Sequence, residues 1–413
     1  MAPVASLLPK RFQLHKGCSA ISLENSLSSI DIGYSIHMVG ALDGIVVADF
    51  SRVLAGPYAS MLLGDLGAHI IKIERPGVGD DLRHLGPPFD ARGRATYFEA
   101  VNRNKDSVEI DLTTPEGVAK AREIALSADI VIENFVPGIM AKYKLDYETL
   151  SAIKPELIYC SITGFGEHPN AAHLQGYDLI AQAAGGLMSI TGEDTDHMVK
   201  VGVPVADLSA GMHAVMGIQA ALIHRMRTGI GQRVSINLMS SVLSILTNQA
   251  AAWINGGVVG KPMGNVHPSI APYQVYLTSD VPMILAVASD GQFVRLAHAL
   301  SMPELATDPR FIKNADRINN QAELNAILTP LFKTKTAVEW SAQLGSAGVP
   351  TGPLNTIDKA VEYATHLGLE PVVFIDDDGV AVAQIAHPVM YSQTPAVYRT
   401  APPQLGESND KYS

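Results

Sequence analysis

Between Leu42 and residue 166 the sequence alternates short apolar runs, typical of buried strands, with longer segments whose apolar residues recur at helical spacing. The strand-like runs are GIVVADF, HIIKIERPG, SVEIDL, DIVIENF and ELIYCSITGFG, and QRVSINL follows further along the chain. Alternating strands and helices pack most simply as a parallel sheet covered by helices. The predicted fold class is therefore α/β, with a large Rossmann-like domain built on a parallel sheet.

Helix signals separate these runs. The first helix is expected in YASMLLGDLGA, and the next over residues 113–128, with Thr114 as its cap and Pro115 in its first turn. Further helices are expected at residues 139–154, from near Asp207 to Thr228, and at residues 240–254. The run KVGVPV, which leads to Asp207, is interpreted as strand-like.

The amino-acid composition changes near Gly256. A stretch rich in Gly and Pro is followed by the strand-like runs YQVYLTS and MILAVAS and by helical segments. We therefore expect a large domain over residues 42–255, a smaller α+β domain over residues 256–335 and a C-terminal segment over residues 336–413. A β-hairpin is expected around Asp377, Asp378 and Gly379.

Composition argues against several classes of partner. Hydrophobic residues make up 47% of the 413 residues and charged residues 17%, as in an ordered globular chain. The net charge of −11 argues against nucleic acid or an anionic membrane surface, because such contacts need clustered Lys and Arg. No apolar stretch is expected to approach the roughly 20 residues that span a bilayer, so no membrane partner is expected. Cys18 and Cys160 are too few for a disulfide framework.

Residues 1–41 form an N-terminal extension that has the features of a mitochondrial transit peptide. Lys10, Arg11 and Lys16 precede the first acidic residue, and Ser and Leu are frequent. A mitochondrial location is predicted on this basis. The alternative is a tail without a targeting role on a cytoplasmic protein.

Common catalytic signatures are absent from the sequence. It contains no P-loop, no HExxH motif and no GxSxG elbow, and no metal site is predicted. The turn after the first strand, SRVLAGP, lacks GxGxxG and so offers no glycine cradle for a dinucleotide pyrophosphate. A nicotinamide-dependent dehydrogenase is therefore disfavoured.

Asp207 is a lone acid in PVADLSAG, at the start of a predicted helix. Backbone N–H groups and the helix dipole favour a carboxylate there by about 0.3–1 kcal/mol, so a structural cap is the simpler interpretation. Its neighbours Ala206, Ser209, Ala210 and Gly211 are small, however, and leave room for a large substrate. The pattern permits a nucleophile without requiring one.

Two other segments provide candidates for substrate contact. In GYDLIAQAAGG, Tyr177 begins a helix that stops at Gly185 and Gly186; a capped helix is the simpler interpretation, and a hydroxyl with a glycine loop over an acyl group is the alternative. His267 lies in the loop GNVHPSIAP, where a surface residue is commoner than a base. Seven cationic residues also lie near strand ends, where open α/β sheets bind ligands: Arg52, Lys72, Arg75, Arg83, Arg103, Lys105 and Lys142.

Several longer motifs, in order along the chain, resemble those of the family III CoA transferases. They are GIVVADFSRVLAGPYASMLLGDLGAHIIKIERPGVGDDLR, NKDSVEIDL, ENFVPG, GYDLIAQAAGGLMSITG, PVADLSAGMHA, TGIGQRVSINLM, GVPTGPLN and PPQLGE. The resemblance implies that Asp207 is the nucleophile that attacks an acyl-CoA thioester. Such an attack gives a mixed anhydride and CoA thiolate; the thiolate then forms an aspartyl-CoA thioester, which the acceptor carboxylate opens.

The same resemblance implies the remaining parts of the site and the assembly. The CoA site would consist of Val53, Leu54, Ala55, Arg75, Ile110, Asn134, Phe135 and Lys142. The CoA thioester would be a substrate, and no tightly bound cofactor is expected. The family also implies an interlocked homodimer, in which both ends of each chain form the large domain and residues 336–413 return to it.

The branch of the family is suggested by departures from its motifs. Leu54 stands where formyl-CoA transferase has a glutamine, and that enzyme's glycine-run loop is missing. GNVHPSIAPYQVY is closer to the dicarboxylate branch, in which succinyl-CoA is a common donor and acids such as glutarate or itaconate are acceptors. α-Methylacyl-CoA racemases carry GHD where this chain has GYD, so Tyr177 replaces one of the two proton-transfer groups that racemisation needs. A racemase-like isomerase and a non-catalytic acyl-CoA-binding protein are the alternatives.

Overall fold

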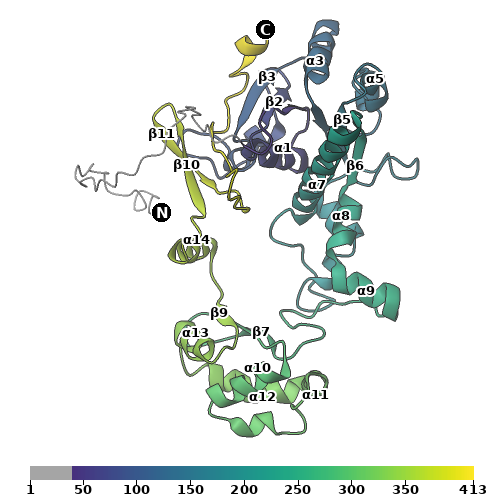
Figure 1. Cartoon of the computed structure of the whole chain (residues 1–413). Coiled ribbons are helices and arrows are strands. Elements are labelled where there is room, and N and C mark those ends of the chain that lie inside the picture. Colours follow the sequence, from purple (N-terminus) through teal and green to yellow (C-terminus); the bar gives the residue numbers. More distant parts are fainter. Residues whose placement is uncertain (1–39) are drawn as a thin grey trace, which may run out of the picture. The chain divides into compact units, whose positions relative to one another are not determined.

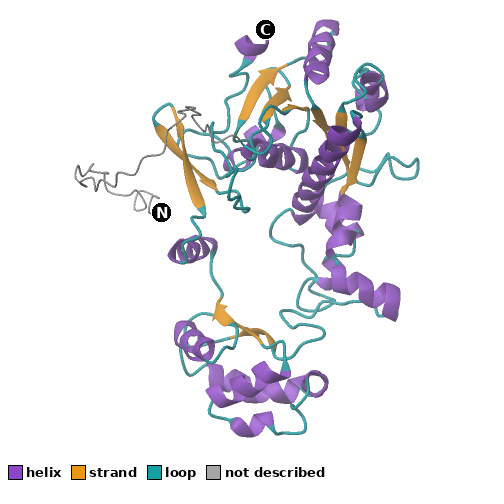
Figure 2. Ribbon diagram, in the orientation of Figure 1, coloured by secondary structure: helices purple, strands orange, loops and turns teal. Residues whose placement is uncertain are grey.

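Six parallel strands form the sheet on which the candidate site is built (Figures 1 and 2). The computed structural model describes residues 40–413, so Cys18 and almost all of the predicted transit peptide lie outside the described part. The strands are β1 (Val46–Asp49), β2 (His69–Glu74), β3 (Lys105–Glu109), β4 (Ile130–Glu133), β5 (Ile158–Thr163) and β6 (Arg233–Asn237). Their order is β3-β2-β1-β4-β5-β6, and every neighbouring pair is parallel. The predicted Rossmann-like sheet is confirmed.

Both faces of the central strands β1, β4 and β5 are buried, which explains why these strands are largely apolar. Along β1, Val47 joins a core cluster with α1 (Ala55–Asp65), whereas Ala48 joins a cluster with α3 (Pro115–Ser127). In β4, Ile130 and Val131 divide between the same two clusters. The two-residue period of a strand therefore sends alternate side chains into two separate cores.

Helices supply the partners of each face. The other helices before the small sheet are α2 (Thr96–Glu99), α4 (Ile139–Lys142), α5 (Tyr147–Ser151), α6 (Asp178–Ala184), α7 (Val205–Thr228), α8 (Leu238–Ile245) and α9 (Thr247–Gly256). Helices α1 and α7 pack against each other on one face of the sheet, where Figure 1 shows them side by side. As predicted, Thr114 caps α3 by accepting a hydrogen bond from the N–H of Gly117 at 3.0 Å, and Pro115 is its first residue.

Three local predictions were wrong. The single helix expected at residues 139–154 is two helices, because Lys144 adopts a left-handed conformation (φ 55°) and the side chain of Asp146 caps a new helix, α5. The helix expected at residues 240–254 is also divided, at Thr247, whose φ is 40°. The run KVGVPV forms no strand: it is irregular until α7 begins at Val205, so Asp207 lies in the first helical turn.

A second, antiparallel sheet has its own core. It consists of β7 (Tyr273–Tyr276), β8 (Met283–Ala286) and β9 (Thr351–Pro353), accompanied by α10 (Asp290–Ala299), α11 (Asn314–Asn319), α12 (Gln321–Phe332) and α13 (Ala337–Ser346). Its buried cluster runs from Tyr276 to Val349 and contains Trp340, whose indole N–H donates to the carbonyl of Phe332 at 2.8 Å. The domain boundary predicted at residue 335 stays a prediction, and the packing continues beyond it.

The C-terminal part begins with α14 (Ile357–His366) and the predicted hairpin, β10 (Val372–Asp377) and β11 (Val380–Ile385). Both turn residues of the hairpin, Asp378 and Gly379, have positive φ, as a two-residue turn of this kind requires. Residues 397–412 then run beside β3: Asn104 donates to the carbonyl of Thr400 at 3.0 Å, and Ser408 donates to that of Ser107 at 3.0 Å. This segment covers the edge strand of the parallel sheet.

Helix α7 departs from one expectation based on composition. It has 24 residues and contains an 18-residue window with a mean hydropathy of 1.2, which by length and composition alone is enough to cross a membrane. The expectation that no segment approaches this limit was wrong. Half of that window is buried within the protein, where the helix packs on α1, α6, α8 and the strands β5 and β6.

Candidate active site

The eight positions assigned to a CoA site lie at the carboxyl ends of four neighbouring strands. Val53, Leu54 and Ala55 follow β1, Arg75 follows β2, Ile110 follows β3, and Asn134 and Phe135 follow β4, with Lys142 at the end of α4. The sheet order β3-β2-β1-β4 brings these strand ends to one edge. Strands β2 and β3 are added on one side of β1, and strands β4 to β6 on the other, so the strand order switches sides between β1 and β4. Open α/β sheets bind ligands in the crevice at such a switch point.

Two of the loops are joined directly. The side-chain amide of Asn134 accepts a hydrogen bond from the N–H of Arg52 at 2.8 Å and donates to the Arg52 carbonyl at 2.7 Å. The Arg52 guanidinium lies 4.9 Å from the centre of the Phe135 ring. The loops after β1 and β4 are therefore held together as one surface.

The seven strand-end cations fall into two groups. Lys72, Lys105, Arg83 and Arg103 are all paired with carboxylates, and apart from Arg83 they are buried. Burial lowers the pKa of the Lys105 ammonium to about 7, although the carboxylate of Asp49 opposes the shift. Arg52, Arg75 and Lys142 remain accessible, and Asp81 pairs with the two arginines, at 3.7 Å and 2.5 Å. Of the seven, these three are the most accessible to an anionic ligand at this edge.

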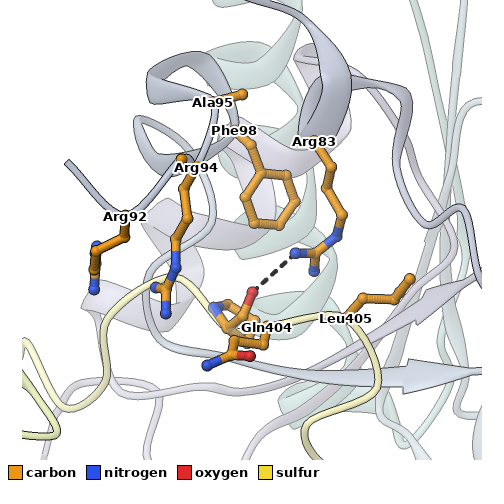
Figure 3. A pocket seen from close by; sticks show the side chains of 9 residues that line it. Arg83, Arg92, Arg94, Ala95, Phe98, Gln404 and Leu405 are labelled. Carbon is orange, nitrogen blue, oxygen red and sulfur yellow. Dashed lines mark hydrogen bonds between the residues drawn. The ribbon is translucent and has the colours of Figure 1, made fainter. Parts of the chain in front are cut away.

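A second group of arginines lines a pocket of about 480 Å³ beside residues 403–405 (Figure 3). Arg83 donates to both oxygens of Glu74 and to the carbonyl of Pro403. Arg92 and Arg94 share the carboxylate of Asp377, and Arg92 also pairs with Asp90 and Glu99. Four carboxylates thus neutralise three guanidinium groups. The arrangement ties the C-terminal segment and the β10–β11 hairpin to residues 83–99 and leaves no excess positive charge for an anion.

Asp207 faces the start of α1 because of a close helix crossing. A Cβ added at Gly211 in α7 would lie 2.8 Å from the Ala55 carbonyl oxygen and 3.0 Å from the Tyr58 ring, so glycine permits this approach. Residues four apart lie on the same face of a helix, which puts Asp207 one turn from the crossing, on the side of α1. Leu208 and Leu54 belong to one apolar cluster. The structure therefore brings the candidate nucleophile to the loop after β1.

The environment of Asp207 differs from the expected helix cap. Asp178, the first residue of α6, takes that role: one carboxylate oxygen accepts from the N–H groups of Ala206 at 2.8 Å and Asp207 at 3.4 Å. Burial, with a smaller effect from the Asp178 charge, raises the pKa of Asp207 to about 7. The side chain that caps the start of α7 is therefore that of Asp178, and burial disfavours the ionised form of Asp207.

Sequence reasoning missed Tyr97. Its pKa is raised by burial and by the charges of Asp207 and Asp178, which places the phenol near both acids. Tyr97 also lines an open pocket of about 370 Å³ with residues 85–88 and Thr96. No local pattern could have revealed it, because Tyr97 approaches Asp207 only through the packing of distant segments.

The four residues predicted to contact the substrate are Tyr177, Gly185, Gly186 and His267. Tyr177 is the exposed residue before α6. Packing requires glycine at position 185, since an added Cβ would lie 2.5 Å from Val242. Gly186 has φ 81°, which favours glycine. His267 lies in the predicted loop, and its hydrogen bonds within residues 40–413 are with Ser269 and Tyr273. The structure explains the two glycines by packing and turn geometry.

Among residues 40–413 there is no cluster of three or more His, Cys, Asp or Glu side chains that could hold a metal ion. Cys160 is fully buried in the core, which strongly raises the pKa of its thiol. A buried protonated thiol is a weak nucleophile. The carboxylate of Asp207 is therefore the stronger candidate for covalent chemistry.

We expect Asp207→Asn to stabilise the protein at alkaline pH. The folded pKa of about 7 lies above the ordinary value of 3.8, so protonation supports the fold at low pH and this support is lost as pH rises through 7. The gain from the neutral amide should grow from about pH 4 to 7 and reach roughly 1–2 kcal/mol at about pH 8, allowing for partial exposure. Urea denaturation at several pH values measures it. Asp196→Asn, at an exposed acid before α7, is the control, and a gain independent of pH would contradict the prediction.

Comparison with known proteins finds CoA-transferases that are similar to most of this chain. A succinate–glutarate CoA-transferase from Agrobacterium fabrum is 43% identical over 378 residues, covering 89% of this chain and 93% of the relative. A human succinyl-CoA:glutarate CoA-transferase is 38% identical over 375 residues, covering 90% and 85%. The crystal structure of a CaiB/BaiF family protein from Brucella suis matches with a TM-score of 0.81 at 42% identity, covering 90% of this chain and 98% of that one.

The match extends over nearly all of the described residues. The family model for CoA-transferase family III matches residues 42–409, which include every strand of the parallel sheet, the small sheet and most of the segment that covers β3. The predicted resemblance is thereby confirmed. This chain belongs to CoA-transferase family III.

Proposed function

We propose that this enzyme transfers CoA from succinyl-CoA to a dicarboxylic acid and that Asp207 is its nucleophile. The observation that carries the proposal is the crossing of α7 and α1 at Gly211, since it sets a carboxylate beside the loop at the β1/β4 switch point. Relatives from Agrobacterium fabrum and human are named for succinate or succinyl-CoA and glutarate, which supports the choice of donor and acceptor.

The CoA nucleotide would lie across the ends of β1–β4. Arg75 and Lys142, with Arg52 beside them, would meet its phosphates, because charged donors form the strongest hydrogen bonds to such oxygens. The acyl thioester would then reach the loop formed by Val53, Leu54 and Ala55, opposite Asp207 on α7. Ile110 and the Asn134–Phe135 pair would contact the nucleotide between these two points.

Covalent transfer from Asp207 keeps the energy of the thioester. Its carboxylate attacks the succinyl carbonyl and CoA thiolate leaves; the thiolate then attacks the aspartyl carbonyl and releases succinate, leaving an aspartyl-CoA thioester. The acceptor carboxylate attacks that thioester, and the returning thiolate takes the new acyl group and frees Asp207. Acylation removes the negative charge of Asp207, so the repulsion from Asp178 is relieved in each covalent intermediate.

An open pocket of about 370 Å³ beside Tyr97 leaves room for a small acid as acceptor. Leu54 is buried next to Leu208, so it offers no polar group to a formyl or oxalyl unit. Racemisation stays disfavoured because Tyr177, at the corresponding position, is exposed and carries no imidazole.

The first prediction of this proposal is a covalent intermediate on Asp207. Incubation with succinyl-CoA followed by hydroxylamine should release CoA and leave a hydroxamate on Asp207, located by peptide mass spectrometry. Asp207→Asn should lower succinyl-CoA:glutarate exchange by at least about a thousandfold, as removal of a nucleophile does. Asp196→Asn is again the matched control and should keep near full exchange.

Four outcomes would count against the proposal. A hydroxamate on another residue, or substantial exchange by Asp207→Asn, would remove Asp207 as the nucleophile. Deuterium incorporated at the α-carbon of a 2-methylacyl-CoA, without exchange between acids, would indicate an isomerase. CoA binding without either reaction would indicate a non-catalytic binding protein. A panel of mono- and dicarboxylates in the exchange assay identifies the acceptor.

The second prediction concerns pH. Asp178 raises the pKa of Asp207, so Asp178→Asn should lower that pKa and shift the acid limb of kcat/KM to lower pH. The asparagine oxygen can still accept from the N–H of Ala206, which keeps the cap, although the amide of Gln182 loses its acceptor. The pH profile of exchange measures the shift, with the melting temperature recorded in parallel. An unchanged or alkaline-shifted limb would contradict the prediction.

We further infer that the enzyme is a homodimer. Large apolar side chains lie exposed on one side of α7 and on α9: Met212, Met216, Ile223, Met226, Trp253 and Ile254. Clustered exposed apolar groups mark interaction surfaces, and a second copy is the occupant that the family resemblance implies. Sedimentation should give twice the chain mass of 44.0 kDa, and a monomer at micromolar concentration would contradict the inference. The mitochondrial location stays a prediction from residues 1–41.

A further inference from the structure

A strained residue begins the loop that would hold the acyl thioester. Val53 has φ 65°, in the left-handed region that β-branched residues rarely adopt. It directly precedes Leu54 and Ala55, where α1 starts without a side-chain cap. Residues kept in such conformations need a surrounding structure that determines them, and they gather at functional sites.

A buried carboxylate holds this conformation. The N–H of Val53 donates to both oxygens of Asp80, at 3.1 and 3.2 Å. One of these oxygens also accepts from the N–H of Leu82 at 3.0 Å. Asp80 is 0% exposed, so water does not compete for these bonds. The position of Asp80 therefore decides where the Val53 amide points.

Lys72 fixes Asp80 from the sheet side. Its ammonium donates to Asp80 at 2.8 Å and to the carbonyl of Ser51 at 3.0 Å, and it is also 0% exposed. Lys72 and Asp80 thus hold the chain on both sides of Arg52, at Ser51 and at Val53. Burial alone would raise the pKa of Asp80, but the charge and hydrogen bond of Lys72 outweigh it and lower the pKa, so the acid stays ionised.

Asp80 is itself held by a second buried carboxylate, that of Glu74. The N–H of Asp80 donates to Glu74 at 2.8 Å, and Glu74 also accepts from Arg83 and from the hydroxyl of Ser107 at 2.6 Å. All of these partners lie on β2, on β3 or in the segment 80–83 that follows β2. The Asp80 carboxylate is therefore held in position by residues of the parallel sheet and of the segment that follows β2.

We propose that Asp80 and Lys72 are positioning residues, which force Val53 into its left-handed conformation and so aim the start of α1 at the CoA thioester. The inference rests on the proposed function, because it assumes that the loop after β1 binds CoA. Neither residue touches the substrate. Their contribution is to keep the loop in one conformation before substrate arrives, which avoids an ordering cost on binding.

A glycine rescue tests the inference. Asp80→Asn removes one carboxylate oxygen and the charge partner of Lys72, and it should weaken binding of CoA, measured by calorimetry, by about tenfold. Adding Val53→Gly should recover at least about threefold of that loss, because glycine adopts positive φ without strain and no longer needs the support. A general loss of folding would not be repaired by this second change.

Asp65→Asn is the matched control. Asp65 forms an equally buried pair with Arg103, at 2.6 Å, at the opposite end of α1. It should lower the melting temperature as Asp80→Asn does but leave CoA binding within about twofold. If Asp80→Asn does not fold, the pair Lys72→Met with Asp80→Asn avoids an unpaired buried ammonium and should show the same weaker binding and the same rescue.

The outcomes separate this inference from the proposed function. Unchanged CoA binding in Asp80→Asn, no rescue by Val53→Gly, or an equal loss in Asp65→Asn overturns the inference. Hydrogen exchange of the wild-type protein with and without CoA examines the assumption beneath it. Protection of residues 52–56 supports that assumption, whereas tight binding that protects a different region overturns the proposed CoA site and this inference together.

Discussion

The close crossing of α1 and α7 is the contact on which the candidate site depends. Gly211 lets the two backbones approach until an added Cβ would touch the Ala55 carbonyl. The buried face of α7 continues with Ala206, Ala210, Ala214 and Ala221, whose small side chains admit α1 and the sheet. Because α1 starts at the end of β1 and α7 carries Asp207, this one crossing sets the distance between the strand-end loops and the reactive acid.

Two acids near the candidate site have pKa values that are shifted in opposite directions. Asp80 is given an ammonium partner and hydrogen-bond donors, which lower its pKa in spite of burial. Asp207 is only partly buried and lies near another carboxylate. Within residues 40–413 no donor hydrogen-bonds to its side chain, and its pKa rises to about 7. Acids of the first kind fix the backbone, whereas an acid of the second kind is less stable as an anion and gains from losing its charge to an acyl group.

The sheet was predictable because its strands are buried on both faces, and buried parallel strands read as apolar runs separated by helices. The hairpin at Asp378 was predictable from its turn residues. The divisions near Lys144 and Thr247 were not, because a single residue with positive φ breaks a helix without any change in apolar spacing. Lys72 was misjudged as a strand-end cation, although the alternation in HIIKIE sets it on the same face as Ile70.

The setting of Asp207 depended on contacts that no local pattern contains. Asp178, which caps α7, lies 29 residues before Asp207, and the sequence between them shows nothing of their approach. The candidate nucleophile itself came from family motifs, since a cap and a reactive acid have the same sequence signature. What the structure adds is the charge, burial and neighbours that make the two distinguishable.

The segment that covers β3 has a consequence for how the protein is made. The N–H of Arg399 donates to the side chain of Asn104, 295 residues earlier in the chain, and Tyr412 donates to Asp106. A ribosome therefore delivers the strands long before the residues that close their edge. Until residues 397–412 emerge, β3 presents unpaired backbone groups, and such an edge is where a nascent chain associates with others. Residues 397–412, synthesised long after β3, thus protect this edge of the sheet from association with other chains.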